Sequence, residues 1–145
     1  MNAGEALQGI WAAWIKRDKA ATLEFFSHDV EYAIFIPQEV LPFGGVTRGK
    51  AALSDRLQMI LDQFDTLSYA PVFHGSDNDT ARGIVHYHFA HKATGETIDG
   101  LMRHVAKMKD GLIVRLEEYH DIDRIQAFMR LVSQRANALP AEFDE

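Results

Sequence analysis

The order in which helical and strand patterns follow one another most limits what this chain can fold into. Apolar residues recur every three or four positions over residues 4–17, and Asp18 can cap a second short helix. Runs rich in strand-forming residues then fill residues 66–119, and a last helical pattern begins near Asp123. Helices followed by a block of strands are typical of an α+β domain rather than of alternating βαβ units.

Turn residues divide the chain between these patterns. A first strand over residues 30–36 ends at Pro37, a loop with Gly44 and Gly45 follows, and a third helix begins after Gly49. The later strands are expected at residues 66–74, 80–91, 96–108 and 112–119. We expect the last hairpin to turn through the three residues 109–111, with glycine in the left-handed position.

Length and charge set the class of protein. A chain of 145 residues fits one domain, so residues 1–145 are expected to form a single unit with a loosely held tail from about residue 137. The net charge of −6 opposes binding to nucleic acid, and no apolar run is long enough to span a membrane. Because the N-terminus lacks a secretory pattern, we expect a cytoplasmic protein.

The composition also limits the chemistry. The chain has no cysteine, which excludes disulfides, thiol nucleophiles and thiolate metal ligands. No cofactor is expected.

The register of the last hairpin predicts which side chains face inward. If residues 109–111 form the loop, Ala106 faces Val114, His104 faces Leu116 and Met102 faces Glu118. This pairing gathers the apolar residues on one face, where a slip of one residue would mix them with charged ones. It also brings His104 and Glu118 to the inner face, diagonal to each other.

A pocket is expected on this inner face. Similar pairing of the preceding hairpin places Phe89 opposite Gly100, Tyr87 opposite Met102 and Val85 opposite His104. The residues predicted to contact a small apolar ligand are Trp14, Tyr32, Tyr87, Phe89, Met102, Leu116 and His120.

Glu118 and His104 are the predicted catalytic pair. A carboxylate among apolar residues is expected to have a raised pKa, which suits a general acid or base, and a histidine beside it suits a proton shuttle. The alternative is that both are ordinary core residues that satisfy each other.

His86 and His88 form a separate candidate site. Two histidines two positions apart on a strand share a face and can begin a metal site. The predicted register places them on the outer face, and the sequence offers no third ligand at an obvious spacing, so a solvent or interface pair is the favoured interpretation.

Several segments resemble the SnoaL-like branch of the nuclear transport factor 2-like superfamily. They are the Trp/Ala-rich first helix, residues 26–32, the step Arg48-Gly49-Lys50 and, above all, residues 110–121 (Asp-Gly-Leu-Ile-Val-Arg-Leu-Glu-Glu-Tyr-His-Asp). The resemblance covers the whole chain. It implies a cone-shaped α+β barrel around a pocket, and a homodimer through the outer sheet face.

The catalytic templates of this superfamily fit in part. Glu118 is in the place of the acidic residue that activates water in members similar to limonene epoxide hydrolase. Those members also have an Arg-x-Asp pair on the neighbouring strand, where this chain has Arg103-His104-Val105 and so lacks the aspartate. The acidic base of ketosteroid isomerases is replaced by apolar residues 34–36. His86, His88 and His104 resemble the histidines of scytalone-dehydratase-like members, without their N-terminal Tyr-Asp pair.

Three functions therefore stay open. The first is an enzyme of lyase, isomerase or hydrolase type that moves a proton on an apolar ligand through Glu118 and His104. The second is a non-catalytic ligand-binding or dimerisation module of the same fold. The third is a metal-dependent enzyme that uses His86 and His88.

Overall fold

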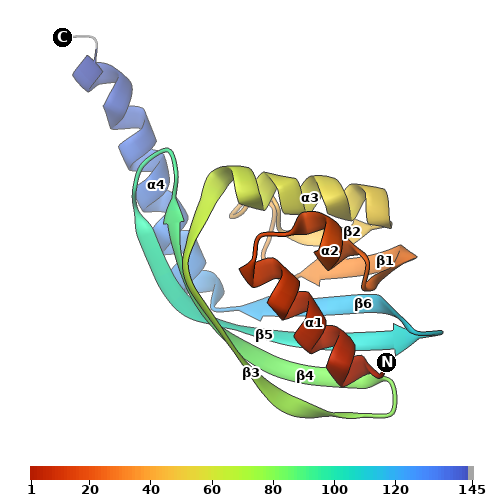
Figure 1. The fold of residues 1–145 in the computed structure, drawn as a ribbon. Helices are drawn as coiled ribbons and strands as arrows, with labels where there is room; N and C mark the ends of the chain where they lie inside the picture. The colour runs from red at the N-terminus through yellow and green to blue at the C-terminus, as the bar shows by residue number, and fades with distance from the viewer. Residues whose placement is uncertain (144–145) are drawn as a thin grey trace.

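The protein is an α+β fold of four helices and one six-stranded sheet within residues 1–143, which the computed structural model describes, with side chains through residue 137 (Figure 1). In chain order the elements are α1 (Ala3–Ile15), α2 (Lys19–Leu23), β1 (Phe26–Ile34), β2 (Gly45–Arg48), α3 (Lys50–Gln63), β3 (Phe64–Asp77), β4 (Thr80–His91), β5 (Thr97–Lys109), β6 (Leu112–His120) and α4 (Ile122–Phe143).

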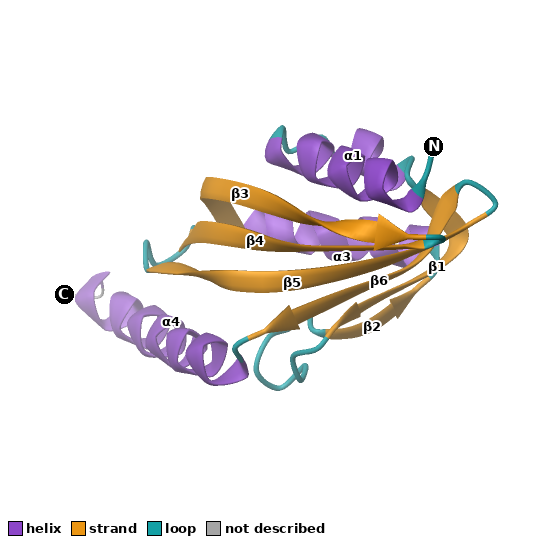
Figure 2. Ribbon diagram, turned by 90° about the horizontal axis from the view of Figure 1, so that it is seen from below, coloured by secondary structure: helices purple, strands orange, loops and turns teal. Residues whose placement is uncertain are grey.

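The sheet is mixed, curved and open. Its strand order is β2-β1-β6-β5-β4-β3, and only β1 and β6 run parallel within it. Helices α1 and α3 pack on one face of the curved sheet, while α4 leaves the end of β6 and extends away from the rest of the molecule (Figures 1 and 2). The expected α+β architecture is confirmed.

Local capping explains where the helices begin. Asn2 and Glu5 form a capping box at α1, and the Asp18 carboxylate accepts a hydrogen bond from the Ala21 amide at 3.0 Å, as expected for the cap of α2. Before α3, Gly49 adopts φ +89°, which a residue with a side chain rarely does. The short strand β2 was not predicted, because only its pairing with β1 identifies it.

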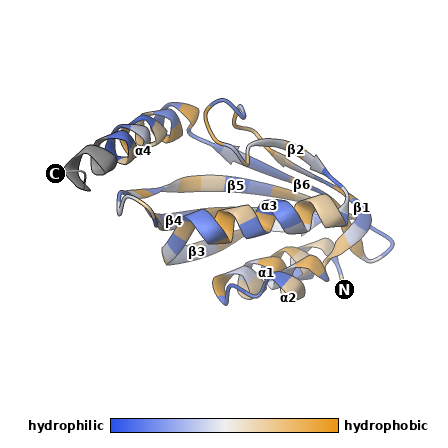
Figure 3. Ribbon diagram, turned by 90° about the horizontal axis from the view of Figure 1, so that it is seen from above, coloured by the Kyte–Doolittle hydropathy of each residue, from blue (hydrophilic) through white to orange (hydrophobic). Residues whose placement is uncertain are grey.

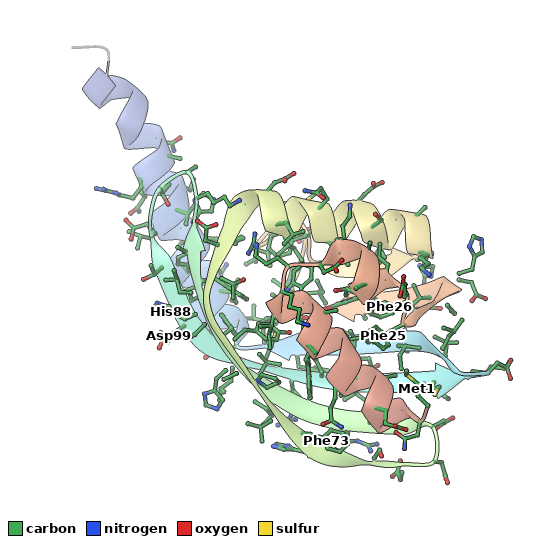
Figure 4. The ribbon with its side chains drawn as sticks, viewed as in Figure 1. Met1, Phe25, Phe26, Phe73, His88 and Asp99 are labelled. Atoms are coloured by element: carbon green, nitrogen blue, oxygen red, sulfur yellow. The ribbon has the colours of Figure 1, made fainter. Side chains whose placement is uncertain are left out.

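Helix α1 packs closely on its neighbours. Gly4 and Gly9 leave room for the rings of Phe73 and Phe25, which lie beside this helix (Figure 4). The helix is mostly apolar in the hydropathy view, whereas apolar and polar residues are intermixed along α4 (Figure 3). Helix α1 is therefore part of the core.

The pairing of β5 with β6 differs from the prediction by two residues. The hairpin turns through two residues, Asp110 and Gly111, both with positive φ, and an Asp-Gly pair favours this tight turn. A register shift then adds Val114 to the β6 side. His104 lies opposite Glu118 as a result, not opposite Leu116, and Met102 lies opposite His120. The inward parity of the even-numbered residues is confirmed for 102–108 and 116–120, but it was wrong before the register shift, where Ile113 is buried and Leu112 is exposed.

The pairing of β4 with β5 is also shifted by two residues. Its turn is a four-residue loop, closed by a hydrogen bond from the His91 amide to the Glu96 carbonyl at 2.8 Å. Tyr87 therefore faces Gly100, and its predicted partner Met102 faces Val85. Phe89 pairs with Ile98 and Gly83 with His104. Because the shift is even, every side chain stays on its predicted face.

The C-terminal part is helical farther than the sequence suggested. The backbone of α4 continues through Phe143, into the stretch from about residue 137 that was expected to be a tail, and residues 144–145 of that expected tail lie outside the described residues. No helix within residues 1–143 is long and apolar enough to cross a membrane.

Candidate active site

A cavity of about 90 Å³ lies between the helices and the inner face of the sheet. Room for one water takes about 10–15 Å³ on this scale, so the cavity can hold a small organic molecule. Nearly all of its wall is aliphatic or aromatic. The seven residues predicted for ligand contact, and both predicted catalytic residues, all line it: Trp14, Tyr32, Tyr87, Phe89, Met102, Leu116, His120, Glu118 and His104.

The polar part of the wall is centred on the carboxylate of Glu118. Its Oε1 accepts a hydrogen bond from the Tyr32 hydroxyl at 2.6 Å and lies 2.9 Å from Nε2 of His104. Its Oε2 lies 2.7 Å from Nε2 of His120. The glutamate is buried, and three strands place these groups together: β1, β5 and β6.

These hydrogen bonds reverse the expected pKa of Glu118. Burial alone would raise the pKa of this carboxyl, but the hydrogen bonds from His104 and His120 outweigh it and hold the pKa below its ordinary value. The prediction of a raised pKa was therefore wrong, because sequence alone did not reveal three donors around one carboxylate. Glu118 is ionised inside the protein.

The buried phenols near this carboxylate stay protonated. Burial raises the pKa of Tyr32 and Tyr69 well above the ordinary value, and the negative charge of Glu118 raises both further. Burial likewise raises the pKa of Tyr87 to about 12. The cavity therefore holds one anion and several neutral donors.

His104 has a second partner that the sequence did not suggest. Its Nδ1 lies 2.9 Å from the indole nitrogen of Trp11, on α1, and both side chains are almost completely buried. The two rings are also stacked, with centroids 6.2 Å apart. The sequence gives no sign of this contact, because no spacing rule connects Trp11 with a histidine 93 positions away.

His120 differs from His104 in having an unused ring nitrogen. Only 8% of its side chain is exposed, and Nδ1 has no hydrogen-bond partner among the described residues. The ring meets that of Tyr87 edge-on, with centroids 6.0 Å apart. Nδ1 is therefore a buried nitrogen without a partner, on a ring that lines the cavity.

Other wall residues were not predicted, because their inward positions depend on tertiary packing. They come from helices, loops and strands: Ile10, Thr22, Phe26, Leu41, Phe43, Leu57, Ile60, Phe64, Tyr69, Ile98, Ile125, Phe128 and Met129. The apolar stripes of the helices were the available signal for Ile10 on α1 and for the three members on α4.

His86 and His88 lie on the outer face of the sheet, away from the cavity. His86 is exposed, and His88 pairs with Asp99 across β4 and β5; both labelled side chains lie near the α4 end of the sheet (Figure 4). Within the part of the chain that the structure describes, no three His, Asp or Glu side chains are grouped so as to hold a metal ion. These residues therefore supply no third ligand for a metal site at His86 and His88.

Comparisons with known proteins identify the family and the fold. Residues 7–116 match the SnoaL-like domain family. A search of curated proteins gives no match.

Solved structures share the fold at low identity. A protein of the nuclear transport factor 2-like (NTF2-like) class from Burkholderia xenovorans LB400 aligns with a TM-score of 0.74 and 23% identity over 86% of this chain and 93% of its own. One from Burkholderia pseudomallei K96243 aligns at 0.76 and 16% identity over 89% and 98%. TerC, co-crystallised with polyporic acid, aligns at 0.72 and 21% identity over 87% and 96%. With its matched sequence and its NTF2-like fold, the chain belongs to the SnoaL-like domain family.

Proposed function

We propose that this protein is an enzyme that binds a neutral, largely apolar small molecule in the internal cavity and moves a proton on it. The observation that carries the proposal is the buried Glu118 carboxylate, hydrogen-bonded by Tyr32, His104 and His120, in an otherwise apolar wall. Burying a charge is costly, and a fold keeps such a group at a ligand cavity most readily when the group serves chemistry there.

The charges of the wall support a neutral ligand. None of the described residues that line the cavity is lysine or arginine, and Glu118 is an anion. A carboxylate or phosphate on the ligand would be repelled there without compensation. An apolar ring system would replace water against the aromatic wall and gain the free energy of burial.

The proton chemistry fits lyase and isomerase reactions, with hydrolysis of an apolar ligand as a further form. A base in the cluster around Glu118 would take a proton from a carbon next to a carbonyl, and the same cluster would return it elsewhere. The fold neighbour co-crystallised with polyporic acid supports a small organic ligand for this cavity.

Deuterium exchange into 2-tetralone tests the proposal without knowledge of the natural substrate. This ketone is neutral, cyclic and enolisable, and its exchange in D₂O is followed by proton NMR. We expect the protein to accelerate exchange next to the carbonyl above the buffer rate, and a Glu118→Gln variant to lose most of the acceleration. The Glu117→Gln variant is the matched control, because Glu117 lies on the same strand and pairs with Arg115 at 3.1 Å.

Two results would count against this function. Binding of 2-tetralone by calorimetry without faster exchange would favour the non-catalytic binding module. Equal acceleration by wild type and Glu118→Gln would remove the carboxylate cluster from the chemistry.

We also propose that the outer sheet face forms a homodimer. This face exposes apolar side chains beside His86, His88 and Arg103, namely Leu101 and the stacked pair of Phe35 and Tyr119. Apolar groups clustered on a surface favour association. Sedimentation equilibrium should give twice the chain mass, and Leu101→Glu should shift it towards the monomer; a wild-type monomer at high concentration would refute the dimer.

A further inference from the structure

The hydrogen bond between Trp11 and His104 fixes the protonation state of that histidine. An indole N–H can donate a hydrogen bond and cannot accept one. Nδ1 of His104, 2.9 Å away, must therefore be the acceptor and carry no proton. The proton of the neutral ring is then on Nε2, where it is donated to Oε1 of Glu118 at 2.9 Å.

A second proton on His104 would have no place. It would go to Nδ1 and point at the indole N–H, so the Trp11 hydrogen bond would be lost inside the core. Trp11 is 2% exposed and His104 is 2% exposed, so water cannot replace that bond without a rearrangement of the core. An unsatisfied donor in the core destabilises the protein, which disfavours the second proton.

His120 has the opposite arrangement. Its Nε2 donates to the ionised Glu118 carboxylate, 2.7 Å away, which orients the ring as a carboxylate orients a catalytic imidazole. Its Nδ1 is free of partners among the described residues, and the ring forms part of the cavity wall. This nitrogen can take up a proton, and the neighbouring carboxylate stabilises the resulting imidazolium.

We infer that the two histidines have different roles: His120 is the catalytic base that exchanges a proton with the ligand through Nδ1, while Trp11 and His104 are positioning residues that hold Glu118 in place. This inference rests on the proposed function for its chemistry, but the protonation states do not. It also replaces the sequence-based expectation that His104 is the proton shuttle.

The proton step balances within the site. A neutral ligand gives a proton from carbon to Nδ1 of His120, leaving an enolate and an imidazolium that stays paired with Glu118. Return of that proton to another ligand carbon completes an isomerisation. Its return to a departing hydroxyl group releases water and completes a dehydration.

Other titratable and charged groups lie around this centre and influence its pH dependence. Tyr32 on β1 donates to Glu118, and Tyr87 on β4 contacts the His120 ring. Near Tyr87, the charges of Arg124, Asp99 and Asp121 also act, in opposite directions. Tyr69 on β3 experiences the charge of Glu118.

Nitrogen-15 NMR of the full chain with labelled histidine tests the assignment directly. The two-bond proton–nitrogen couplings of the seven histidines report which ring nitrogen carries a proton, and His104→Gln and His120→Gln variants assign the signals. We expect the His104 ring to carry its proton on Nε2, because the indole N–H of Trp11 occupies Nδ1. We expect the His120 ring to carry a proton on Nε2, the nitrogen that faces Glu118.

Either of two spectra would overturn the inference: a His104 ring that carries a proton on Nδ1, or a His120 ring that is protonated on Nδ1 alone. Neither requires a substrate, so the assignment can fail or stand independently of the proposed function.

The Trp11→Phe variant tests the positioning role. Without the indole N–H, Nδ1 of His104 is free to carry a proton, so the nitrogen-15 couplings should show that ring protonated on Nδ1 as well as on Nε2. Trp14→Phe is the matched control, since Trp14 also lines the cavity but Nδ1 of His104 is bonded to Trp11, so the His104 signals should not change. In the 2-tetralone exchange assay, His120→Gln should cost about 100-fold or more, the usual contribution of a general base; a loss under threefold would refute the catalytic role.

Discussion

Replacing Glu118 with alanine is expected to lower the free energy of unfolding by about 3–5 kcal/mol, the usual cost of removing one partner from a buried ionic cluster. The carboxylate accepts from Tyr32, His104 and His120. All three donors would lose their acceptor inside the protein at once. Urea denaturation at pH 7, followed by circular dichroism, measures the change.

The matched control is Glu117→Ala. Glu117 is the preceding residue on β6 but lies on the outer face, where it pairs with Arg115 and Tyr119. Partly exposed pairs of this kind contribute about 0–1 kcal/mol. Equal losses in the two variants would mean that the Glu118 cluster has no special energetic role.

The pH dependence of the Glu118→Ala effect follows from the lowered pKa of Glu118. The folded-state pKa lies below the unfolded value, which is about 4.3 for a glutamate. The ionised form is therefore the stabilised one, and its contribution is complete above the unfolded pKa and declines as the pH falls towards the folded pKa. The part of the stability difference that comes from ionised Glu118 should be complete above about pH 5 and shrink below about 4.

Strand parity was the part of the site that the sequence could predict. Alternation along residues 102–108 and 116–120 separates apolar from charged side chains, and that separation survives any even shift in register. Glu118, His104 and His120 could therefore be placed on the inner face although both hairpin registers were two residues off. The same rule placed His86 and His88 outside.

The contacts within the site could not be predicted in the same way. The position of His104 directly opposite Glu118 depends on a tight turn at Asp110-Gly111 and on one extra residue at Val114, and alternation does not report either. The Trp11 bond depends on how α1 lies across the sheet. The lowered pKa of Glu118 follows only once all its donors are known.

Gly83 explains how an indole ring reaches a histidine on the inner face of the sheet. It lies on β4 directly opposite His104 on β5, and a Cβ built there would overlap the ring of Trp11. The same Cβ would be 2.8 Å from the carbonyl oxygen of Val72. The absent side chain leaves the space that the Trp11 ring occupies.

Gly83→Ala should therefore destabilise the protein, although glycine in a strand interior is ordinarily worse than alanine by about 0.5–1 kcal/mol. We expect a loss of about 1–3 kcal/mol, as for other overpacked cores. Neither neighbour can yield easily, because one is backbone and the other a fully packed tryptophan. Chemical denaturation measures the sign and size of the change.

The same substitution should also release His104. If the ring of Trp11 is displaced from Nδ1, the nitrogen-15 spectrum should show a proton on Nδ1 of this histidine, as in the Trp11→Phe variant. Arg82→Ala, one residue away on the outer face, is the control: its side chain is half exposed and 3.7 Å from Asp77, so its removal should cost about 1 kcal/mol or less and leave the His104 signals unchanged. A stabilised Gly83→Ala protein with His104 still protonated on Nε2 alone would show that the indole has room to move, and that the packing at Gly83 does not hold the Trp11–His104 pair.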